Sequence, residues 1–273
     1  MERIKQALER ARRDQSTASE SQLLPPALNP QSQVEPNSAQ QTIKYSQTKV
    51  VPLVLSDLKD NRIIAGSESD VANTAYKMLR TQVLQRMMAK GWNALAVTSP
   101  GPGDGKTLTA INLAISLARE VQHTVLLVDF DMRKPSIHEY FNFTPAKGIT
   151  DFLLRETPVS EILVNPGIER LVLLPGRESV PNSSELLASP RMVKLVDELK
   201  SRYPSRFVLF DLPPLLSADD ALAFSPYVDT VLMVINEGKT TKEELLHAMG
   251  MVGNTQVLGT VLNRSADRIS TYY

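Results

Sequence analysis

Cysteine is absent from the 273 residues of this chain, and no apolar run approaches the roughly 20 residues of a membrane-spanning helix. The missing thiols exclude disulfide bonds and thiol chemistry, which suits the cytosol. The 30 basic residues are balanced by 30 acidic ones, so no general nucleic-acid-binding surface is indicated. Residues 1–8 also lack the apolar core of a signal peptide. We therefore expect a cytoplasmic protein without a membrane span of its own, which meets the inner face of a membrane only through a partner.

The first 60 residues have little of the regular apolar spacing that builds a core. Residues 1–13 are predicted to form a short basic helix. This is either a marginal, solvated helix or a docking helix for a partner or an anionic membrane surface. Residues 14–60 are rich in Gln, Ser and Pro and are predicted to be a disordered linker, because they cannot bury enough apolar surface to offset their chain entropy. Within the linker, the brief apolar stretch 50–55 is expected to pack against the domain that follows.

Residues 61–265 are predicted to form one domain in which strands and helices alternate. Strands are predicted at 92–98, 124–128, 171–174, 207–210, 231–235 and 257–262. Helices are predicted at 70–90, 108–120, 148–154, 159–164, 181–187, 191–203 and 241–251. Thr240 is the expected cap of the last helix. The apolar runs of the strands are mostly continuous and not alternating, which indicates a parallel sheet covered by helices on both faces. Residues 266–273 are predicted to be a flexible tail.

The loop of residues 99–107 joins the first strand of this domain to a helix. Its glycines allow backbone N–H groups to approach a phosphate closely, and the helix N-terminus adds a favourable dipole. Lys106 is expected to reach the β- and γ-phosphates, and the Thr107 hydroxyl to hold Mg²⁺. The loop is a variant of the pattern G-x-x-x-x-G-K-[ST], because Pro100 stands where that pattern has its first glycine. The residues expected to surround the phosphates are Gly101, Gly103, Asp104, Gly105, Lys106, Thr107 and Leu108.

Three aspartates stand directly after predicted buried strands. Asp129 and Asp131 follow strand 124–128, and their spacing of two residues points both side chains the same way. Asp211 follows strand 207–210. Ligands of α/β folds bind at the carboxyl ends of parallel strands, where carboxylates suit Mg²⁺ or the activation of an attacking hydroxyl. Taken alone, the Asp129–Asp131 pair would be read as a polar exit from a strand, but behind a phosphate loop it is predicted to be functional.

Residues 99–107, 129–133 and 210–214 resemble the Walker A, A′ and B motifs of bacterial tyrosine kinases (BY-kinases) from capsule and exopolysaccharide loci. The resemblance covers roughly residues 65–265, and it implies an α/β fold of the P-loop NTPase type with variant Walker motifs and a mostly parallel sheet. The basic N-terminus and the Gln/Ser/Pro linker resemble the tyrosine autokinases of exosortase (PEP-CTERM) loci. The implied activity is transfer of phosphate from ATP to protein tyrosine, including the protein's own, in the regulation of polysaccharide synthesis and export.

The resemblance also implies roles for individual residues, with ATP and Mg²⁺ as cofactors. Lys106 and the loop amides would bind the ATP phosphates, while Thr107 and Asp211 would hold Mg²⁺. Asp129 and Asp131 would complete the metal shell, and one of them would assist the attacking tyrosine hydroxyl. Arg133 would either steady a phosphate or orient the A′ loop. Asn263 resembles the family's adenine-side residue.

Partners and acceptors follow from the same resemblance. The expected partner is the cytoplasmic tail of a membrane chain-length regulator, that is, a polysaccharide co-polymerase, and a homo-oligomer is expected. The family's E-x-x-R-x-x-R helix motif, associated with ring assembly, reads Thr74, Lys77 and Arg80 here, without the carboxylate. Tyr272 and Tyr273 are the candidate phospho-acceptors, since they sit at a free chain end, and the alternative is that they are inert. Tyr45 in the linker is the next candidate.

Two other readings remain open for the sequence. The first is a non-kinase ATPase switch of the partitioning or division-site type. Such proteins carry an extra lysine near the start of the loop, and residues 99–102 contain none. The second is a non-catalytic scaffold that keeps only the fold. The intact Lys106 and Thr107 and the three strand-terminal aspartates argue against it.

Overall fold

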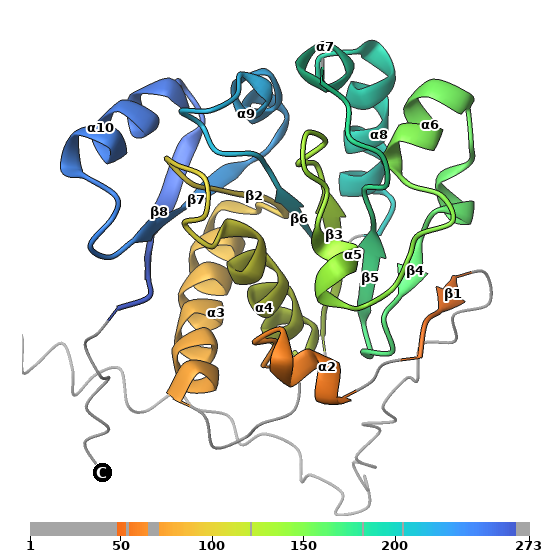
Figure 1. Ribbon diagram of the computed structural model, residues 1–273, viewed down its shortest axis with the longest axis horizontal. Coiled ribbons are helices and arrows are strands. Elements are labelled where there is room, and N and C mark those ends of the chain that lie inside the picture. The colour runs from red at the N-terminus through yellow and green to blue at the C-terminus, as the bar shows by residue number, and fades with distance from the viewer. Residues whose placement is uncertain are drawn as a thin grey trace, which may run out of the picture. The chain divides into compact units, whose positions relative to one another are not determined.

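The strand that leads into the loop of residues 99–107 is an interior strand of a single sheet (Figure 1). A computed structural model describes residues 48–52, 55–64, 71–120, 122–181, 183–203 and 205–265. The predicted N-terminal helix, the linker up to residue 47 and the tail with Tyr272 and Tyr273 lie outside these residues. No helix in the described ranges is both long and apolar enough to cross a bilayer.

The described strands pair in the order β1-β4-β5-β3-β6-β2-β7-β8. They are β1 (Lys49–Val50), β2 (Ala94–Thr98), β3 (Thr124–Asp129), β4 (Val164–Asn165), β5 (Leu171–Leu174), β6 (Arg206–Asp211), β7 (Thr230–Asn236) and β8 (Gln256–Asn263). Their pairings are parallel except that between β4 and β5. The sheet is therefore mostly parallel, as the continuous apolar runs predict.

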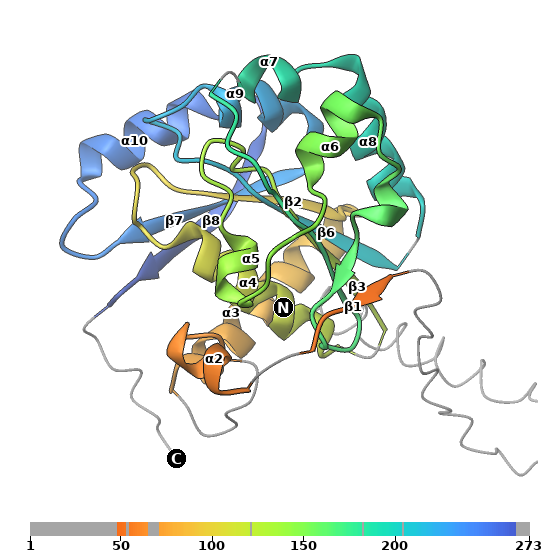
Figure 2. The same ribbon diagram turned by 45° about the vertical axis from the view of Figure 1, so that its right-hand side comes forward.

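Helices cover both faces of the sheet (Figures 1 and 2). They are α2 (Leu55–Asp60), α3 (Val71–Lys90), α4 (Lys106–Ala118), α5 (Ile137–Tyr140), α6 (Ile149–Arg155), α7 (Ser183–Leu187), α8 (Pro190–Ser201), α9 (Asp220–Phe224) and α10 (Lys242–Met251). One apolar cluster joins the sheet to α2, α3, α4 and α5, and another joins it to α6–α10. This three-layer arrangement confirms the predicted α/β fold of the P-loop NTPase type.

Strand β2 shows why the sheet needs cover on both sides. Ala94 and Ala96 contribute to the cluster on the α6–α10 face, while Leu95 and Val97 contribute to the cluster around α4. Its residues are buried throughout, because successive side chains point to opposite faces and both faces are packed. The strand is thus held rigidly at the point where it delivers the loop.

Three details correct the sequence predictions. The domain begins before residue 61, because α2 buries Leu58 to 3% exposure and β1 pairs with β4, both within the predicted linker. The segment 159–164 is not one helix: a 3₁₀ turn at Val159–Glu161 is followed by β4. The cap of α10 is Thr241, whose hydroxyl accepts from the Glu244 N–H at 3.1 Å.

Candidate active site

The loop of residues 99–107 connects the end of β2 to the start of α4. Gly103 and Gly105 have φ angles of 77° and 97°, in the left-handed region that residues with side chains rarely adopt. A Cβ atom on Gly105 would also lie 2.0 Å from Nδ2 of Asn263, so this position requires glycine. The loop therefore turns tightly around the N-terminus of α4, where backbone N–H groups are available to an anion.

The other predicted loop residues lie around this turn. Asp104 is buried, and its carboxylate accepts a hydrogen bond from the Gly101 N–H at 2.9 Å. Asn263, at the end of β8, donates from Nδ2 to the Asp104 carbonyl at 2.8 Å, so the structure brings it to the loop. Its adenine-side role stays a prediction. Leu108 is half-buried and packs against the apolar cluster around α4.

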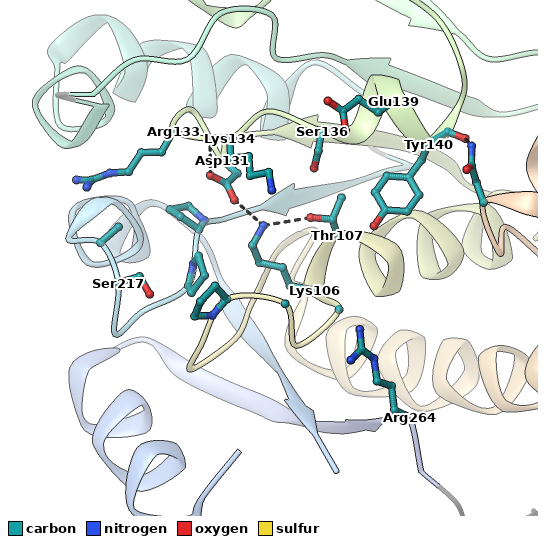
Figure 3. A pocket seen from close by; sticks show the side chains of 17 residues that line it. Lys106, Thr107, Asp131, Arg133, Lys134, Ser136, Glu139, Tyr140, Ser217 and Arg264 are labelled. Atoms are coloured by element: carbon teal, nitrogen blue, oxygen red, sulfur yellow. Dashed lines mark hydrogen bonds and ion pairs between the residues drawn. The ribbon is translucent and has the colours of Figure 1, made fainter. Parts of the chain in front are cut away.

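Lys106 lies among the polar side chains of the site, and Figure 3 shows it directed toward Asp131. Its Nζ atom is 2.7 Å from Asp131 Oδ2, 3.4 Å from Asp211 Oδ1 and 3.1 Å from Thr107 Oγ1. The Thr107 hydroxyl in turn donates to Asp211 Oδ2 at 2.7 Å. Burial alone would lower the pKa of Lys106, but the charges of Asp211 and Asp131 outweigh it and raise that pKa. The lysine is thus held charged beside the loop.

Asp129 is fully buried at the end of β3. Its Oδ2 atom accepts from the N–H groups of Ser136 at 2.9 Å and Ile137 at 3.0 Å, and its Oδ1 atom has no hydrogen-bond partner in the described part of the chain. Burial, reinforced by the charge of Asp211, raises the pKa of Asp129 to about 8. Burial also raises the pKa of Asp211, although Lys106 opposes it.

The donor set suits a divalent cation. Lys106 contacts Asp131 and Asp211, and Asp129 pairs with Asp211 across β3 and β6, so buried carboxylates outnumber the lysine and a bound cation would favour their ionised forms. Hydroxyl and carboxylate oxygens are the ligands that Mg²⁺ prefers, and it commonly shares them with substrate phosphates. Over the described ranges, no three acidic, His or Cys residues are grouped to hold a metal by themselves. The residues that fit Mg²⁺ jointly with phosphate oxygens are Thr107 and Asp211.

Arg133 takes a different direction from the other predicted residues, and Figure 3 shows it pointing away from Lys106. Its Nε atom donates to Asp220 Oδ1 and its Nη2 atom to Asp219 Oδ1, each at 2.9 Å. Asp220 is fully buried and also accepts from the Ser183 hydroxyl. Of the two roles left open for Arg133, this geometry favours the orientation of the segment after β3.

A cavity of about 600 Å³ opens beside the loop, and its lining includes side chains that the sequence motifs do not contain. Tyr140 of α5 lines it, half-buried, and burial followed by the charge of Asp211 raises the pKa of its hydroxyl. Asn61 also lines it and donates to the Tyr140 carbonyl at 2.8 Å. Arg264 enters from the end of β8 (Figure 3). The position of Tyr140 shortly after the Asp129–Asp131 pair is a usable sequence signal, whereas nothing in the sequence marks Asn61.

Comparison with known proteins identifies relatives over most of the chain. Residues 93–257 match the family model described as an AAA domain. The tyrosine-protein kinase YwqD of Bacillus subtilis is 32% identical over 204 residues, which are 74% of this chain and 85% of that protein.

Solved structures agree with this comparison. The kinase domain of the Escherichia coli tyrosine kinase ETK has a TM-score of 0.70 and 28% identity, covering 86% of this chain and 87% of that one. The chimerical protein CapA2B2 has a TM-score of 0.69 and 29% identity, covering 80% of this chain and 94% of that one. The similarity therefore covers most of the chain.

Proposed function

The chain belongs to the tyrosine-protein kinase family of bacteria, within the AAA-domain proteins, and from this premise we propose how its residues transfer phosphate from ATP to a tyrosine hydroxyl. The observation that carries the proposal is the contact set of Lys106, which joins the loop to Asp131 and Asp211. Phosphoryl transfer needs chiefly positioning and charge stabilisation, and this set supplies both.

The loop provides the positioning. Backbone N–H groups of residues 103–107 would surround the β- and γ-phosphates, and Lys106 would place its ammonium on the transferred group, where charge develops. Mg²⁺, when bound, would supply further neutralisation of the phosphate charge. Thr107 and Asp211 would hold it, because the threonine hydroxyl and the aspartate carboxylate already lie 2.7 Å apart.

Asp129 and Asp131, the two carboxylates at the end of β3, are proposed to have different roles. Asp131 lines the cavity, so it accepts the proton of the attacking tyrosine hydroxyl. Asp129 is inaccessible from the cavity and bonded to two backbone N–H groups. It therefore fixes the segment after β3, and a bound Mg²⁺ would favour its ionised form. The phosphorus–oxygen bond to ADP breaks as the bond to the tyrosine oxygen forms.

The biological setting is part of the proposal. The protein phosphorylates its own tyrosines and regulates capsular or exopolysaccharide synthesis from the cytoplasmic side of the membrane, as an exosortase-locus kinase. The proposed partner is the cytoplasmic tail of a membrane chain-length regulator, and the similarity to the chimerical protein CapA2B2 supports it. A homo-oligomer would allow the tail of one copy, with Tyr272 and Tyr273, to reach the site of another.

The test is incubation of the purified full-length chain with Mg-ATP, followed by mass-spectrometric mapping of phosphotyrosine. Label on tyrosine that disappears in Lys106→Met supports the proposal, and label on Tyr272 or Tyr273 supports the acceptor assignment. ATP hydrolysis without any tyrosine label would instead indicate an ATPase switch and overturn the kinase mechanism. The partner's cytoplasmic tail, added as a peptide, is expected to increase the labelling rate.

A further inference from the structure

A second lysine reaches the phosphate loop from the connection between β7 and α10. The Lys239 Nζ atom lies 3.1 Å from Asp104 Oδ1 and also donates to the Pro102 carbonyl. A Cβ atom built on Gly103 would lie 3.6 Å from the same Nζ. Lys239 therefore contacts the outer side of the loop, while Lys106 lies on the inner side with Asp131.

The connection is built so that Lys239 faces the loop. Asn236, the last residue of β7, accepts from the N–H groups of Lys239 at 3.1 Å and Thr240 at 2.9 Å, and its own N–H donates to the Thr240 hydroxyl at 2.9 Å. Gly238 has a φ of 73°, which permits the tight turn. These hydrogen bonds fix the backbone at Lys239, so its side chain extends toward the loop from a fixed position.

The electrostatics explain why a lysine is needed there. Asp104 is only 2% exposed, although it sits in a loop that must receive a polyphosphate. Its carboxylate is bonded to the Gly101 N–H, which carries no net charge. Lys106 is engaged by Asp131 and Asp211, so Lys239 is the cation that faces Asp104. Without it, a buried negative charge would lie beside the incoming phosphates.

We propose that Lys239 is a positioning residue for nucleotide binding: it neutralises Asp104 and holds the loop at Pro102 in the conformation that accepts phosphate. This inference rests on the proposed function, because it assumes that the loop binds ATP. Lys239 is expected to change the affinity for nucleotide and not the rate of the chemical step, because it acts through Asp104 and the loop backbone. Asp104 is the residue through which it acts.

The first experiment measures Mg-ADP binding by calorimetry and the KM for ATP in autophosphorylation. Lys239→Ala is expected to weaken Mg-ADP binding about five-fold and to raise the KM for ATP about five-fold, with kcat unchanged. A five-fold change corresponds to about 1 kcal/mol, which is typical of an ion pair at a protein surface. Lys239→Arg should restore most of the affinity, because it keeps the charge. Lys242→Ala, on the first turn of α10 and exposed, is the matched control and should bind like the wild type.

A double-mutant cycle identifies the mechanism. If Lys239 acts by neutralising Asp104, then Lys239→Ala in an Asp104→Asn background should have less than half of its effect in the wild type. An equal effect in both backgrounds would mean that Lys239 does not act by neutralising Asp104, and it would overturn the inference. So would unchanged affinity of Lys239→Ala in a protein that binds Mg-ADP and labels tyrosine. A wild-type chain that binds no nucleotide would instead overturn the proposed function and the inference together.

Discussion

At the start of α6, one buried aspartate has two arginines beside it, whereas at the carboxyl edge of the sheet only one lysine lies among three buried aspartates and contacts two of them, Asp131 and Asp211. The Asp151 carboxylate lies 2.7 Å from Arg155 and 3.3 Å from Arg177. Burial would raise the pKa of Asp151, but a backbone N–H and these arginines outweigh it and lower that pKa. At the sheet edge the balance is reversed, and the pKa of Asp129 rises to about 8 although Lys106 is close.

This difference distinguishes Asp151, which stabilises the fold, from the aspartates at the sheet edge, whose charge is balanced only when a ligand binds. Around Asp151 the chain supplies its own compensating charge, so nothing from outside is required. Around Lys106 the compensation is incomplete, and an added divalent cation would lower the energy of the ionised carboxylates. Incomplete compensation of buried charge at the end of parallel strands is therefore the physical mark of this site.

Removal of the metal is the strongest test of this comparison. Chelation with EDTA is expected to abolish tyrosine labelling, and excess Mg²⁺ to restore it, because the sheet edge cannot balance the phosphate charge alone. Asp211→Asn should raise the Mg²⁺ concentration for half-maximal activity about ten-fold. In the wild type, Mg-ADP should also raise the melting temperature, which is a readout independent of activity. Full labelling in EDTA would contradict the metal assignment.

Loss of the single lysine is the next largest effect. Lys106→Met is expected to reduce the labelling rate about 10²- to 10³-fold, because it removes a charge that stabilises the transferred phosphate. The fold should persist, since α4 is buried along nearly its whole length by apolar residues. Circular dichroism and thermal melting check the fold, and Lys194→Met on the exposed side of α8 is the control. Wild-type rates in Lys106→Met would contradict the assignment.

Variants of Arg133 test whether this positive charge binds the phosphate of the substrate or positions the segment after β3. Arg133→Ala is expected to lower the rate about ten-fold by loosening the segment after β3. If Arg133 acts through its contact with Asp220, then Asp220→Asn should lower the rate similarly, and the double variant should be no worse than either single one. Additive losses would show that Arg133 works on the phosphate directly.

The smallest effect is expected at the compensated acid. Asp151→Asn should lower stability by about 1 kcal/mol at pH 7 and leave the kinase rate unchanged, because the arginines lose a partner that does not line the cavity. The pKa of Asp151 is lower in the folded protein than in the unfolded chain, where it is about 3.9. Its ionised carboxylate therefore stabilises the fold above that value, and this stabilisation is lost as the pH falls through the folded-state pKa. The stability gap between variant and wild type should therefore shrink below pH 4 in denaturant titrations. A gap that is constant with pH would mean that charge is not involved.

Local signals in the sequence were sufficient for the loop and the strand-terminal aspartates. Gly105, Lys106 and Thr107 are adjacent in the chain, and the strands before Asp129 and Asp211 are short continuous apolar runs. Such features depend on a few neighbouring residues, so the α/β fold was predicted correctly from them. The structure also brings Lys106 together with Asp131 and Asp211, as the same-edge argument requires.

Tertiary contacts decided the features that were missed. β1 and α2 lie in a stretch with weak local preference, and they form because β1 adds to the sheet beside β4 and Leu58 enters the core around α4. For Arg133, orientation of the segment after β3 was one of the two expected roles, but its partners Asp219 and Asp220, from a distant part of the chain, were not expected. Pairings between remote side chains leave no trace in local spacing.

The position of β2 between β6 and β7 has a consequence for synthesis on the ribosome. Ala94 pairs with Val208 and Leu95 with Thr230, so the strand that carries the loop gains its neighbours long after it leaves the exit tunnel. Such non-local parallel pairing is slow, and until it is complete the apolar faces of β2 and α4 are open to aggregation or chaperones. A nascent chain therefore acquires its nucleotide site only after β7 has emerged, and the contact of Asn263 with the loop is among the last to form.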